Sequence, residues 1–423
     1  MKNDIKTDSS CMDDFDQDSI TTDVALEKIL SSIIPTKETE TIPIRESLNR
    51  ILAKDIKSDI NVPSARNSAM DGYAIDSNDI SKIKNTELTI IGKSLAGKPF
   101  NESIKNGQCV RIMTGAVMPK NADTVVIQER VSLSKSGNKI VIGNDIEPGA
   151  NVREAGEDIS KGVIALKKGK NLTPADIGLL ASLGIAEVRV NQKLKIAFFS
   201  TGDELCSVGE KLNMGSVYDS NRYTLYAMLT KLNVEIIDMG VVNDDKELLS
   251  KAFKKAAGNV DMLITSGGVS VGEADYVKEI LENYGNINFW KVAIKPGRPL
   301  TFGKINTTFF FGLPGNPVSV MVTFYQFAQL AIKKLAGESS YAPTLLKVPS
   351  ASSLRKKPGR VEYQRGILEK DKNNNFIVRK TGPQGSGILR SMSDANCFIV
   401  LPIDCEGVNP GELVNIQPFQ GII

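Results

Sequence analysis

Between Leu194 and Gly337 the chain alternates short apolar runs with helical patterns, and this alternation restricts the folds it can adopt. In the helical patterns apolar residues recur three and four positions apart, as in Leu225, Met228 and Leu229. Strands and helices that alternate in this way predict a mostly parallel, doubly wound sheet, so the expected fold class is multidomain, α/β plus all-β. The predicted strands are Lys195–Ser200, Val234–Met239, Met262–Thr265, Asn288–Ile294 and Thr308–Gly312.

The third predicted strand leads into a glycine-rich segment, Ser-Gly-Gly-Val-Ser-Val-Gly-Glu-Ala-Asp-Tyr at 266–276, which precedes a helical pattern. A strand that ends in such a turn presents backbone N–H groups at the carboxyl edge of the sheet, where open α/β sheets bind anionic ligands. The segment also carries the acids Glu273 and Asp275, which a plain phosphate site does not need. Acids beside an anion site predict a divalent cation between protein and phosphate, and Mg²⁺ is the expected cofactor.

The rest of the chain combines short helices with β-rich stretches. Helical patterns at Asp23–Ile34 and Pro174–Leu183 predict helices, the second with Thr173 as its N-cap. Short β-rich runs at 61–161 predict an all-β insertion, and those at 341–423 predict a small barrel or sandwich. The expected domains are a disordered acidic tail (1–22), a bridging domain (23–60 and 162–193), the β-rich insertion (61–161), the α/β domain (194–340) and the C-terminal β domain (341–423).

Composition excludes several kinds of chemistry. None of the 423 residues is histidine, which excludes Ser-His-Asp and Cys-His nucleophile systems, histidine-ligated zinc and histidine general bases. The five cysteines form no Cys-x-x-Cys pair, so reduced thiols in a cytoplasmic protein are expected. The net charge of +3 is too small to predict nucleic-acid or membrane binding, and no apolar run approaches the ~20 residues of a membrane span. Any reaction must therefore use carboxylates, lysines, arginines, backbone dipoles and bound metal.

The segment Gly92–Pro99 fits the Gly-x-x-x-x-Gly-Lys pattern of a phosphate-binding loop. A functional loop of that kind needs Ser or Thr as its next residue, to bind Mg²⁺, and a helix after it. Pro99 occupies that position and no apolar helix follows, so the segment is predicted to be a β-turn.

Other segments that follow predicted strands are candidates for the same ligand-binding edge. Glu204 follows the first strand, Asp244 follows the second, and the loop Gly312–Ser319 suits an anion-binding helix start. Lys291 and Lys295 are predicted to share one face of a strand. Each segment also has a structural explanation: a turn with Asp203 as a helix cap, a helix start with Asp245 as its cap, a tight strand–helix turn, or a solvated strand face.

Taken together, eight motifs in one order resemble those of the molybdopterin molybdenumtransferases, the MoeA family that includes the E domain of gephyrin. The motifs fall within residues 61–319, and the organisation into four folded parts extends the likeness to nearly the whole chain. They are Ser68–Ala74, Thr114–Ala116, Arg153–Asp158, Ser200–Leu205, Asp219–Asn221, Ser266–Tyr276, Lys295–Pro299 and Gly312–Pro317.

The resemblance implies a step in molybdenum cofactor biosynthesis, in which molybdenum from molybdate is inserted into adenylylated molybdopterin and AMP is released. It also implies a MogA-like α/β domain, a C-terminal β-barrel and an elongated homodimer, with the α/β crevice of one chain facing the β insertion of the other. The molybdopterin adenylyltransferase and acceptor molybdoenzymes are further expected partners.

The resemblance also assigns roles to residues that match the family's motifs. Catalytic roles fall on Asp71, Thr114, Asp158, Glu204, Asp244, Asp275, Lys291 and Lys295. Cofactor binding falls on Arg153, Ser200, Thr201, Gly202, Asp219, Ser220, Asn221, Ser266, Gly267, Gly268, Val269, Ser270, Pro296, Gly297, Arg298, Pro314, Gly315, Asn316, Pro317, Arg365 and Ser386. Asp244, Asp275 and Glu204 are the expected metal ligands, and which acid binds metal and which activates water stays open. One departure is Asn121, where the family has Gly, and it affects the conformation of a turn.

Two other functions stay open. The α/β segment also resembles the molybdopterin adenylyltransferases, but those enzymes lack the β insertion and the C-terminal β domain. A non-catalytic molybdopterin-binding scaffold, comparable to gephyrin in receptor clustering, would not need the acids. ATP consumption without molybdate would favour the first function, and binding without reaction would favour the second.

Overall fold

The computed structural model describes residues 19–81, 83–268, 280 and 285–419, and these form two compact units. The first unit contains the residues up to Glu40, Asn49–Ile51 and those from Val190 onward, and the second contains Thr41–Leu48 and Leu52–Arg189. The finer division into domains remains a prediction. Three predicted site residues, Val269, Ser270 and Asp275, lie outside the described residues, as does the start of the acidic tail.

A six-stranded sheet forms the centre of the first unit, in the order β16-β13-β17-β21-β20-β18. The first four strands in this order are parallel, which confirms that part of the prediction, whereas β20 is antiparallel to both of its neighbours, β21 and β18. The antiparallel β20 was not predicted; it reaches β21 through a tight turn in which Asn306 has a φ of +54°, a conformation that Asn tolerates. The strands are β13 (Lys195–Thr201), β16 (Glu235–Val242), β17 (Met262–Ser266), β18 (Gly285–Lys291), β20 (Pro299–Ile305) and β21 (Thr308–Leu313).

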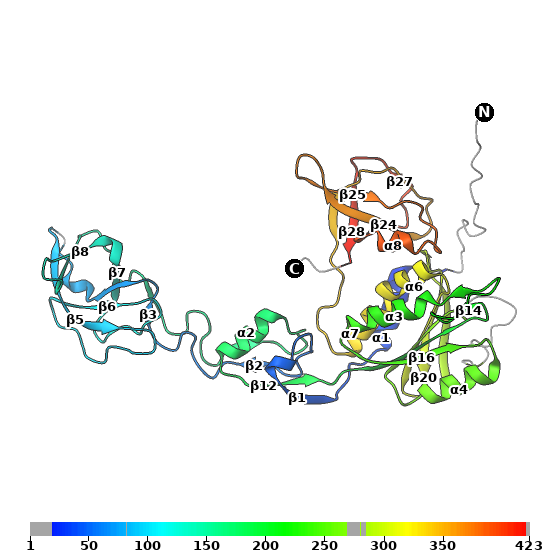
Figure 1. The fold of residues 1–423 in the computed structure, drawn as a ribbon, viewed down its shortest axis with the longest axis horizontal. Coiled ribbons are helices and arrows are strands. Elements are labelled where there is room, and N and C mark those ends of the chain that lie inside the picture. Colours follow the sequence, from blue (N-terminus) through cyan, green and yellow to red (C-terminus); the bar gives the residue numbers. More distant parts are fainter. Residues whose placement is uncertain (1–18, 82, 269–279, 281–284, 420–423) are drawn as a thin grey trace. The chain divides into compact units, whose positions relative to one another are not determined.

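Helices cover both faces of this sheet because side chains alternate along its apolar central strands. Phe198 and Phe311 belong to a core with α1, α3, α6 and α7, whereas Phe199 and Phe310 pack with α4 on the other face (Figure 1). Phe253 of α4 contacts Phe199 and Phe310 edge-on, at ring-centroid distances of 5.7 and 5.5 Å. The helical elements are α1 (Thr22–Ser32), α3 (Ser220–Thr230), α4 (Lys246–Ala256), α6 (Pro317–Thr323), the π-helical η4 (Phe324–Ala328) and α7 (Gln329–Leu335).

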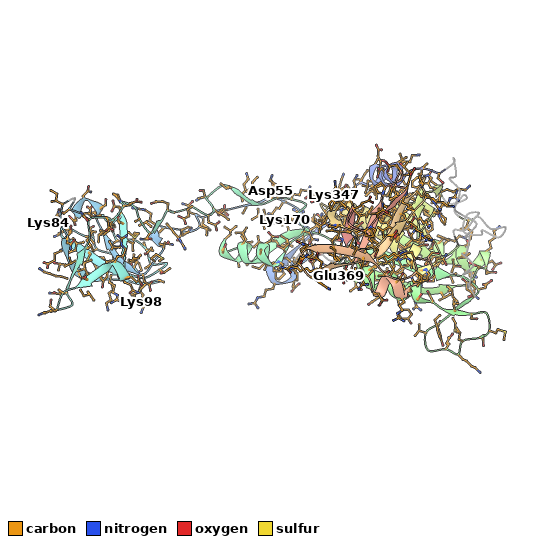
Figure 2. The ribbon with its side chains drawn as sticks, turned by 90° about the horizontal axis from the view of Figure 1, so that it is seen from above. Asp55, Lys84, Lys98, Lys170, Lys347 and Glu369 are labelled. Carbon is orange, nitrogen blue, oxygen red and sulfur yellow. The ribbon has the colours of Figure 1, made fainter. Side chains whose placement is uncertain are left out.

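The C-terminal part of the first unit is a second sheet, in the order β19-β24-β26-β28-β22, with β25 paired to β24. The β24–β25 hairpin turns at Asn374, whose φ is +66°. An ion pair of 2.8 Å joins Glu369, which Figure 2 labels, to Arg379 on the paired strand. A short loop leads from β18 in the central sheet to β19, and β19 pairs with β24 in the C-terminal sheet. The C-terminal sheet therefore adjoins the central one. The strands of this sheet are β19 (Ile294–Lys295), β22 (Leu346–Pro349), β24 (Val361–Lys370), β25 (Phe376–Lys380), β26 (Cys397–Leu401) and β28 (Leu413–Pro418). The same part of the chain contains the helix α8 (Arg390–Ser393) and a separate pair of short strands, β23 (Leu354–Arg355) and β27 (Gly407–Val408). The small strands β14 (Leu205–Cys206) and β15 (Val217–Tyr218) also pair with each other.

The second unit is built on a six-stranded sheet in the order β7-β4-β6-β5-β9-β8, as the β-rich pattern predicts. Its helix α2 (Pro174–Ser182) has the predicted N-cap Thr173, which forms a capping box with Asp176. The other elements are β1 (Thr39–Pro43), η1 (Ile44–Glu46), β2 (Ile56–Lys57), β3 (Asn67–Ser68), β4 (Gly72–Ile75), η2 (Ser77–Asp79), β5 (Thr86–Ser94), β6 (Gln108–Ile112), β7 (Thr124–Ile127), η3 (Gln128–Arg130), β8 (Val131–Leu133), β9 (Lys139–Ile142), β10 (Val152–Arg153), β11 (Ile164–Leu166) and β12 (Glu187–Asn191).

The segment that imitates a phosphate-binding loop is a turn, as predicted. Leu95 and Lys98 exchange backbone hydrogen bonds of 3.0 and 2.9 Å at the end of β5, and Figure 2 marks Lys98 there. Gly97 occupies the left-handed region with a φ of +76°, which a glycine adopts without steric cost.

The cysteines that the structure describes are free. Cys109 and Cys397 are buried, and burial raises the pKa of each thiol to about 12, which keeps both protonated and unreactive. Within the described residues no helix is both long and apolar enough to cross a membrane.

Candidate active site

A cavity of about 600 Å³, hereafter the crevice, lies at the carboxyl edge of the central sheet in the first unit. Parallel register places Ser200 opposite Ser266, and Ser266 opposite Leu313, so the loops after β13, β17 and β21 meet at one place. This is the edge at which open α/β sheets bind ligands. The lining residues are Thr201, Gly202, Glu204, Leu205, Asn221, Asp244, Ser266, Gly267, Gly268, Ile294, Lys295, Pro296, Gly297, Arg298, Pro299, Pro314, Gly315, Asn316, Ser319, Arg360, Gln384, Gly385 and Ser386.

Asn221, at the start of α3, joins two of the loops that form the crevice. Its Nδ2 donates to the Oγ of Ser266 at 2.8 Å and to the carbonyl oxygen of Gly315 at 2.7 Å. Asp219 is the N-cap of the same helix and accepts hydrogen bonds from the backbone N–H of Arg222 and the Oγ of Ser200, both at 3.1 Å. The predicted Asp-Ser-Asn motif therefore ties the strand ends together, and Asn221 is the member that lines the crevice.

The glycine-rich turn is tightly packed at its first glycine. Gly267 has a φ of +90°, and a Cβ atom there would lie 2.3 Å from the carbonyl oxygen of Thr201. Its N–H donates to the carbonyl oxygen of Leu313 at 3.1 Å, so this group already has a partner. Gly267 thus allows two strand ends to approach closely, which differs from the predicted role of donating its N–H to a phosphate.

Two of the predicted acids, Asp244 and Glu204, line the crevice. Thr201 donates through Oγ1 to the Asp244 carboxylate, and the Asp244 N–H donates to Oδ1 of Asp203 at 3.2 Å. The neighbouring Asp245 is the N-cap of α4, accepting from two backbone N–H groups at 2.9 and 3.0 Å, as predicted. Asp203 does not cap a helix, because the chain turns into the short strand β14 instead.

These acids suit a magnesium ion that shares its coordination with a ligand. Mg²⁺ usually keeps several waters and binds through one or two carboxylates plus substrate phosphates. The described residues contain no cluster of three or more acidic or cysteine side chains that would enclose a metal alone. Asp244 and Glu204, which both line the crevice, are the predicted ligands that could hold such an ion, and the third predicted ligand, Asp275, lies outside the described residues.

The predicted pair of lysines is separated by the fold. Lys291 is the last residue of β18 in the central sheet, whereas Lys295 ends β19, which pairs with β24 in the C-terminal sheet. They do not share a strand face, because the chain leaves the central sheet between them. Lys295 and Arg298 line the crevice and Lys291 does not.

The C-terminal sheet contributes a wall that the sequence analysis only partly predicted. Ser386 lines the crevice as expected, but Arg365 does not; it is 1% exposed and donates to the carbonyl oxygen of Gly385 and the Oγ of Ser391, both at 3.0 Å. Burial lowers the pKa of its guanidinium to about 10. Arg365 therefore holds the segment that forms the wall.

Three lining residues of this wall, Arg360, Gln384 and Gly385, were not predicted. Arg360 precedes the predicted Arg365 by five residues, and Gln384 and Gly385 directly precede the predicted Ser386. This closeness in sequence to predicted site residues was the available signal. The remaining predicted residues of this unit, Ser200, Ser220 and Pro317, lie beside lining residues without lining the crevice.

The second unit gathers another group of predicted residues. The N–H of Gly115 donates to the carbonyl oxygen of Ser68 at 2.8 Å. Strand β10 pairs antiparallel with β3, and Arg153 lies opposite Asn67 in this pairing. The motifs around Asp71, Thr114 and Arg153–Asp158 are therefore neighbours, with Asp71 and Thr114 on the surface. Asn121, where the family has Gly, has a φ of +69°, so Asn preserves the left-handed turn.

Asp71 and Thr114 form a pair of hydrogen bonds whose effect can be measured. Oδ1 of Asp71 accepts from the Thr114 N–H at 2.7 Å and from Oγ1 at 2.8 Å. These two hydrogen bonds hold the pKa of the Asp71 carboxyl below its ordinary value of 3.8, and the bond from the Thr114 backbone N–H has the larger effect. Because the folded pKa is lowered, the stabilising effect is present above the ordinary pKa and is lost as pH falls through the lowered one.

Thr114→Val is expected to raise the pKa of Asp71 part of the way back to its ordinary value. The substitution removes the hydroxyl donor and keeps the backbone donor, which is the larger cause of the shift. Carboxyl chemical shifts in an NMR titration would measure the change, with Thr86→Val, in strand β5 of the same unit, as a control. An unchanged Asp71 pKa would show that the Thr114 hydroxyl does not bond this carboxylate in solution.

Comparisons with known proteins agree with this architecture. Three family profiles match in order: the MoeA N-terminal region (domain I and II) at residues 20–184, a probable molybdopterin binding domain at 197–334, and the MoeA C-terminal region (domain IV) at 347–419.

Relatives match over nearly the full length. The chain is 45% identical to the molybdopterin molybdenumtransferase of Haemophilus influenzae, over 96% of this chain and 100% of that protein. It is 35% identical to gephyrin of Dictyostelium discoideum, over 89% of this chain and 59% of that protein. The crystal structure of the molybdopterin biosynthesis moeA protein from Pyrococcus horikoshii matches with a TM-score of 0.84 and 31% identity, covering 95% of this chain and 100% of the other. The chain therefore belongs to the MoeA family of molybdopterin molybdenumtransferases.

Proposed function

We propose that the chain inserts molybdenum from molybdate into adenylylated molybdopterin and releases AMP. The observation that carries this proposal is the crevice, where carboxylates, cations and the loops of three strand ends converge in a chain of this family. Molybdate and a pyrophosphate linkage are both anionic, so a site for them needs positive charge, and carboxylates there need a cation between themselves and the ligand.

In this proposal Lys295 and Arg298 neutralise the negative charge of the substrates, and both line the crevice. Asn221 keeps the β17 and β21 loops at their spacing through its bonds to Ser266 and Gly315. Asp244 and Glu204 would hold magnesium, which when bound supplies electrophilic polarisation of the phosphoanhydride. Thr201 orients the Asp244 carboxylate by donating to it.

The finer features that the resemblance implies are part of the same proposal. We infer that the central sheet with its helices is a MogA-like domain, that the C-terminal strands form a barrel, and that two chains form a homodimer. The match to a probable molybdopterin binding domain supports the first inference, and the other two are what the resemblance to the family implies. Asp71, Thr114, Arg153 and Asp158 are proposed to take part in the reaction, and the free cysteines fit a cytoplasmic protein. The adenylyltransferase that makes the substrate and the molybdoenzymes that accept the product are the proposed partners.

Release of AMP by the purified protein tests the proposed function. We expect AMP to appear from adenylylated molybdopterin only when molybdate and Mg²⁺ are both present, because each contributes to the reacting complex. Chromatographic measurement of AMP, with each component omitted in turn, would show this. ATP consumption without molybdate would instead indicate an adenylyltransferase, and tight pterin binding without release would indicate a scaffold.

A further inference from the structure

Two cationic residues that line the crevice, Lys295 and Arg298, belong to one segment of the chain, residues 291–298, hereafter the crossing loop. This segment leaves the central sheet at the end of β18 and enters the C-terminal sheet as β19. At its base the N–H of Val292 donates to the carbonyl oxygen of Arg298 at 2.8 Å. The place of both side chains in the crevice therefore depends on how the crossing loop is held.

The residue two positions before helix α1 holds the crossing loop from one side. Ile20 forms a parallel β-bridge with Val292. Its N–H donates to the carbonyl oxygen of Lys291 at 3.0 Å, and its own carbonyl oxygen accepts from the N–H of Ala293 at 2.8 Å. A single residue near the N-terminus thus provides both hydrogen bonds of this pairing.

These bonds form where the crossing loop is shielded from water. Val292 and Ala293 are 0% and 2% exposed. A buried backbone group that loses its partner is destabilised, since water does not replace the bond. On the other side, the carbonyl oxygen of Ala293 accepts from the N–H of Val361 at 2.9 Å, at the start of β24. The crossing loop is therefore held between the N-terminal segment and the C-terminal sheet.

Ile20 is itself fixed to the rest of the first unit. Its side chain packs against the hydrophobic core that α1 shares with the central sheet. The next residue, Thr21, is the N-cap of α1, and its Oγ1 accepts from the N–H of Val24 at 3.3 Å. Ile20 is thus anchored by its side chain and by the helix that follows it, so it can act as a rigid support.

We propose that Ile20 is a positioning residue for the reaction: its backbone fixes the crossing loop and so keeps Lys295 and Arg298 in place for the anionic substrates. The inference rests on the proposed function, in which these two side chains neutralise substrate charge. Among the described residues, those that line the crevice begin at Thr201, so Ile20 acts through the loop without touching a ligand. A displacement of about 1 Å at a positioning contact can lower a rate by about a hundredfold, so such support matters.

The substitution Ile20→Pro tests this proposal, because proline lacks the N–H that bonds to Lys291. The matched control is Ile20→Ala, which keeps both backbone bonds and removes most of the side chain. Amide hydrogen exchange would be measured by mass spectrometry on peptides that cover the crossing loop. We expect exchange there to be about fivefold faster or more in Ile20→Pro than in Ile20→Ala. Equal exchange in the two variants would overturn the proposal.

Steady-state kinetics of AMP release separate positioning from a loss of stability. A less stable enzyme has fewer active molecules, which lowers the apparent kcat and leaves KM unchanged. Displaced cations instead weaken substrate binding. Ile20→Pro should therefore raise KM for adenylylated molybdopterin about fivefold or more, whereas Ile20→Ala should keep it within about twofold of the wild type. A KM that rises equally in both variants, or in neither, would contradict a role for the Ile20 backbone.

The wild-type protein provides a test that needs no variant. Its Ala293 amide should exchange slowly because it donates to Ile20, and rapid exchange at this amide would overturn the proposal even if Ile20→Pro failed to fold. Thermal unfolding monitored through Trp290 shows whether the variants are folded. If the wild type released no AMP, the proposed function would fail, and hydrogen exchange would still decide whether Ile20 holds the crossing loop.

Discussion

Asp244→Asn is expected to lower molybdate-dependent AMP release by about a hundredfold or more while the protein stays folded. Asn has the shape of Asp and retains an Oδ1 acceptor, so Thr201 can still donate to it and the loop keeps its position. What disappears is the negative charge, which a magnesium ligand in the crevice would need. Initial rates at several Mg²⁺ concentrations would measure the effect, and a higher Mg²⁺ concentration should restore part of the activity.

The neighbouring acid provides a matched control. Asp245→Asn removes the same charge one residue further on, at the N-cap of α4, where Asn caps a helix about as well as Asp. We expect this variant to retain nearly full activity and stability. Equal losses in both variants would show that the general charge of the loop matters, and that Asp244 has no specific role.

Gly267→Ala is expected to destabilise the first unit by about 3 kcal/mol and to abolish binding in the crevice. Two costs add at this position. A residue with a Cβ atom is strained at a φ of +90°, by about 1–2 kcal/mol. The new methyl would also lie 2.3 Å from the Thr201 carbonyl oxygen, so β13 and β17 would have to separate where they form the crevice.

Unfolding in urea, monitored by tryptophan fluorescence, measures the stability of the first unit, which contains Gly267. Trp290 is the only tryptophan of the chain, and it stacks on Phe302 in the central sheet at a ring-centroid distance of 6.1 Å. Gly258→Ala is the control, because Gly258 has a similar φ of +77° with no atom within 4 Å of the added Cβ. It isolates the backbone strain of about 1–2 kcal/mol. A Gly267→Ala variant no less stable than Gly258→Ala would disprove the close approach of the two strand ends.

Local hydrogen bonds explain which elements could be predicted. The predicted caps Thr173 and Asp245 hold their helices through backbone groups within three residues, so a short stretch of sequence contains the whole interaction. The loops after β13, β17 and β21 were predicted to meet because parallel strands bring their carboxyl ends to one edge. That rule needs only the order of strands and helices along the chain.

Contacts between distant segments explain what could not be predicted. The antiparallel β20, the separation of Lys291 from Lys295, and the burial of Arg365 all depend on which sheet a segment joins. The register and pairing of such segments are set by packing against residues far away in the chain, which periodicity does not record.

By itself, therefore, the sequence determined the four parallel strands, the helix caps, the residues at the ligand edge and the family. Only the tertiary structure decided that Arg365 holds a wall of the crevice, that Arg360, Gln384 and Gly385 complete that wall, and that Ile20 bonds to the crossing loop. The physical reason is the range of the interactions: caps and turns form within a few residues, whereas a cavity forms between sheets whose strands are distant in sequence.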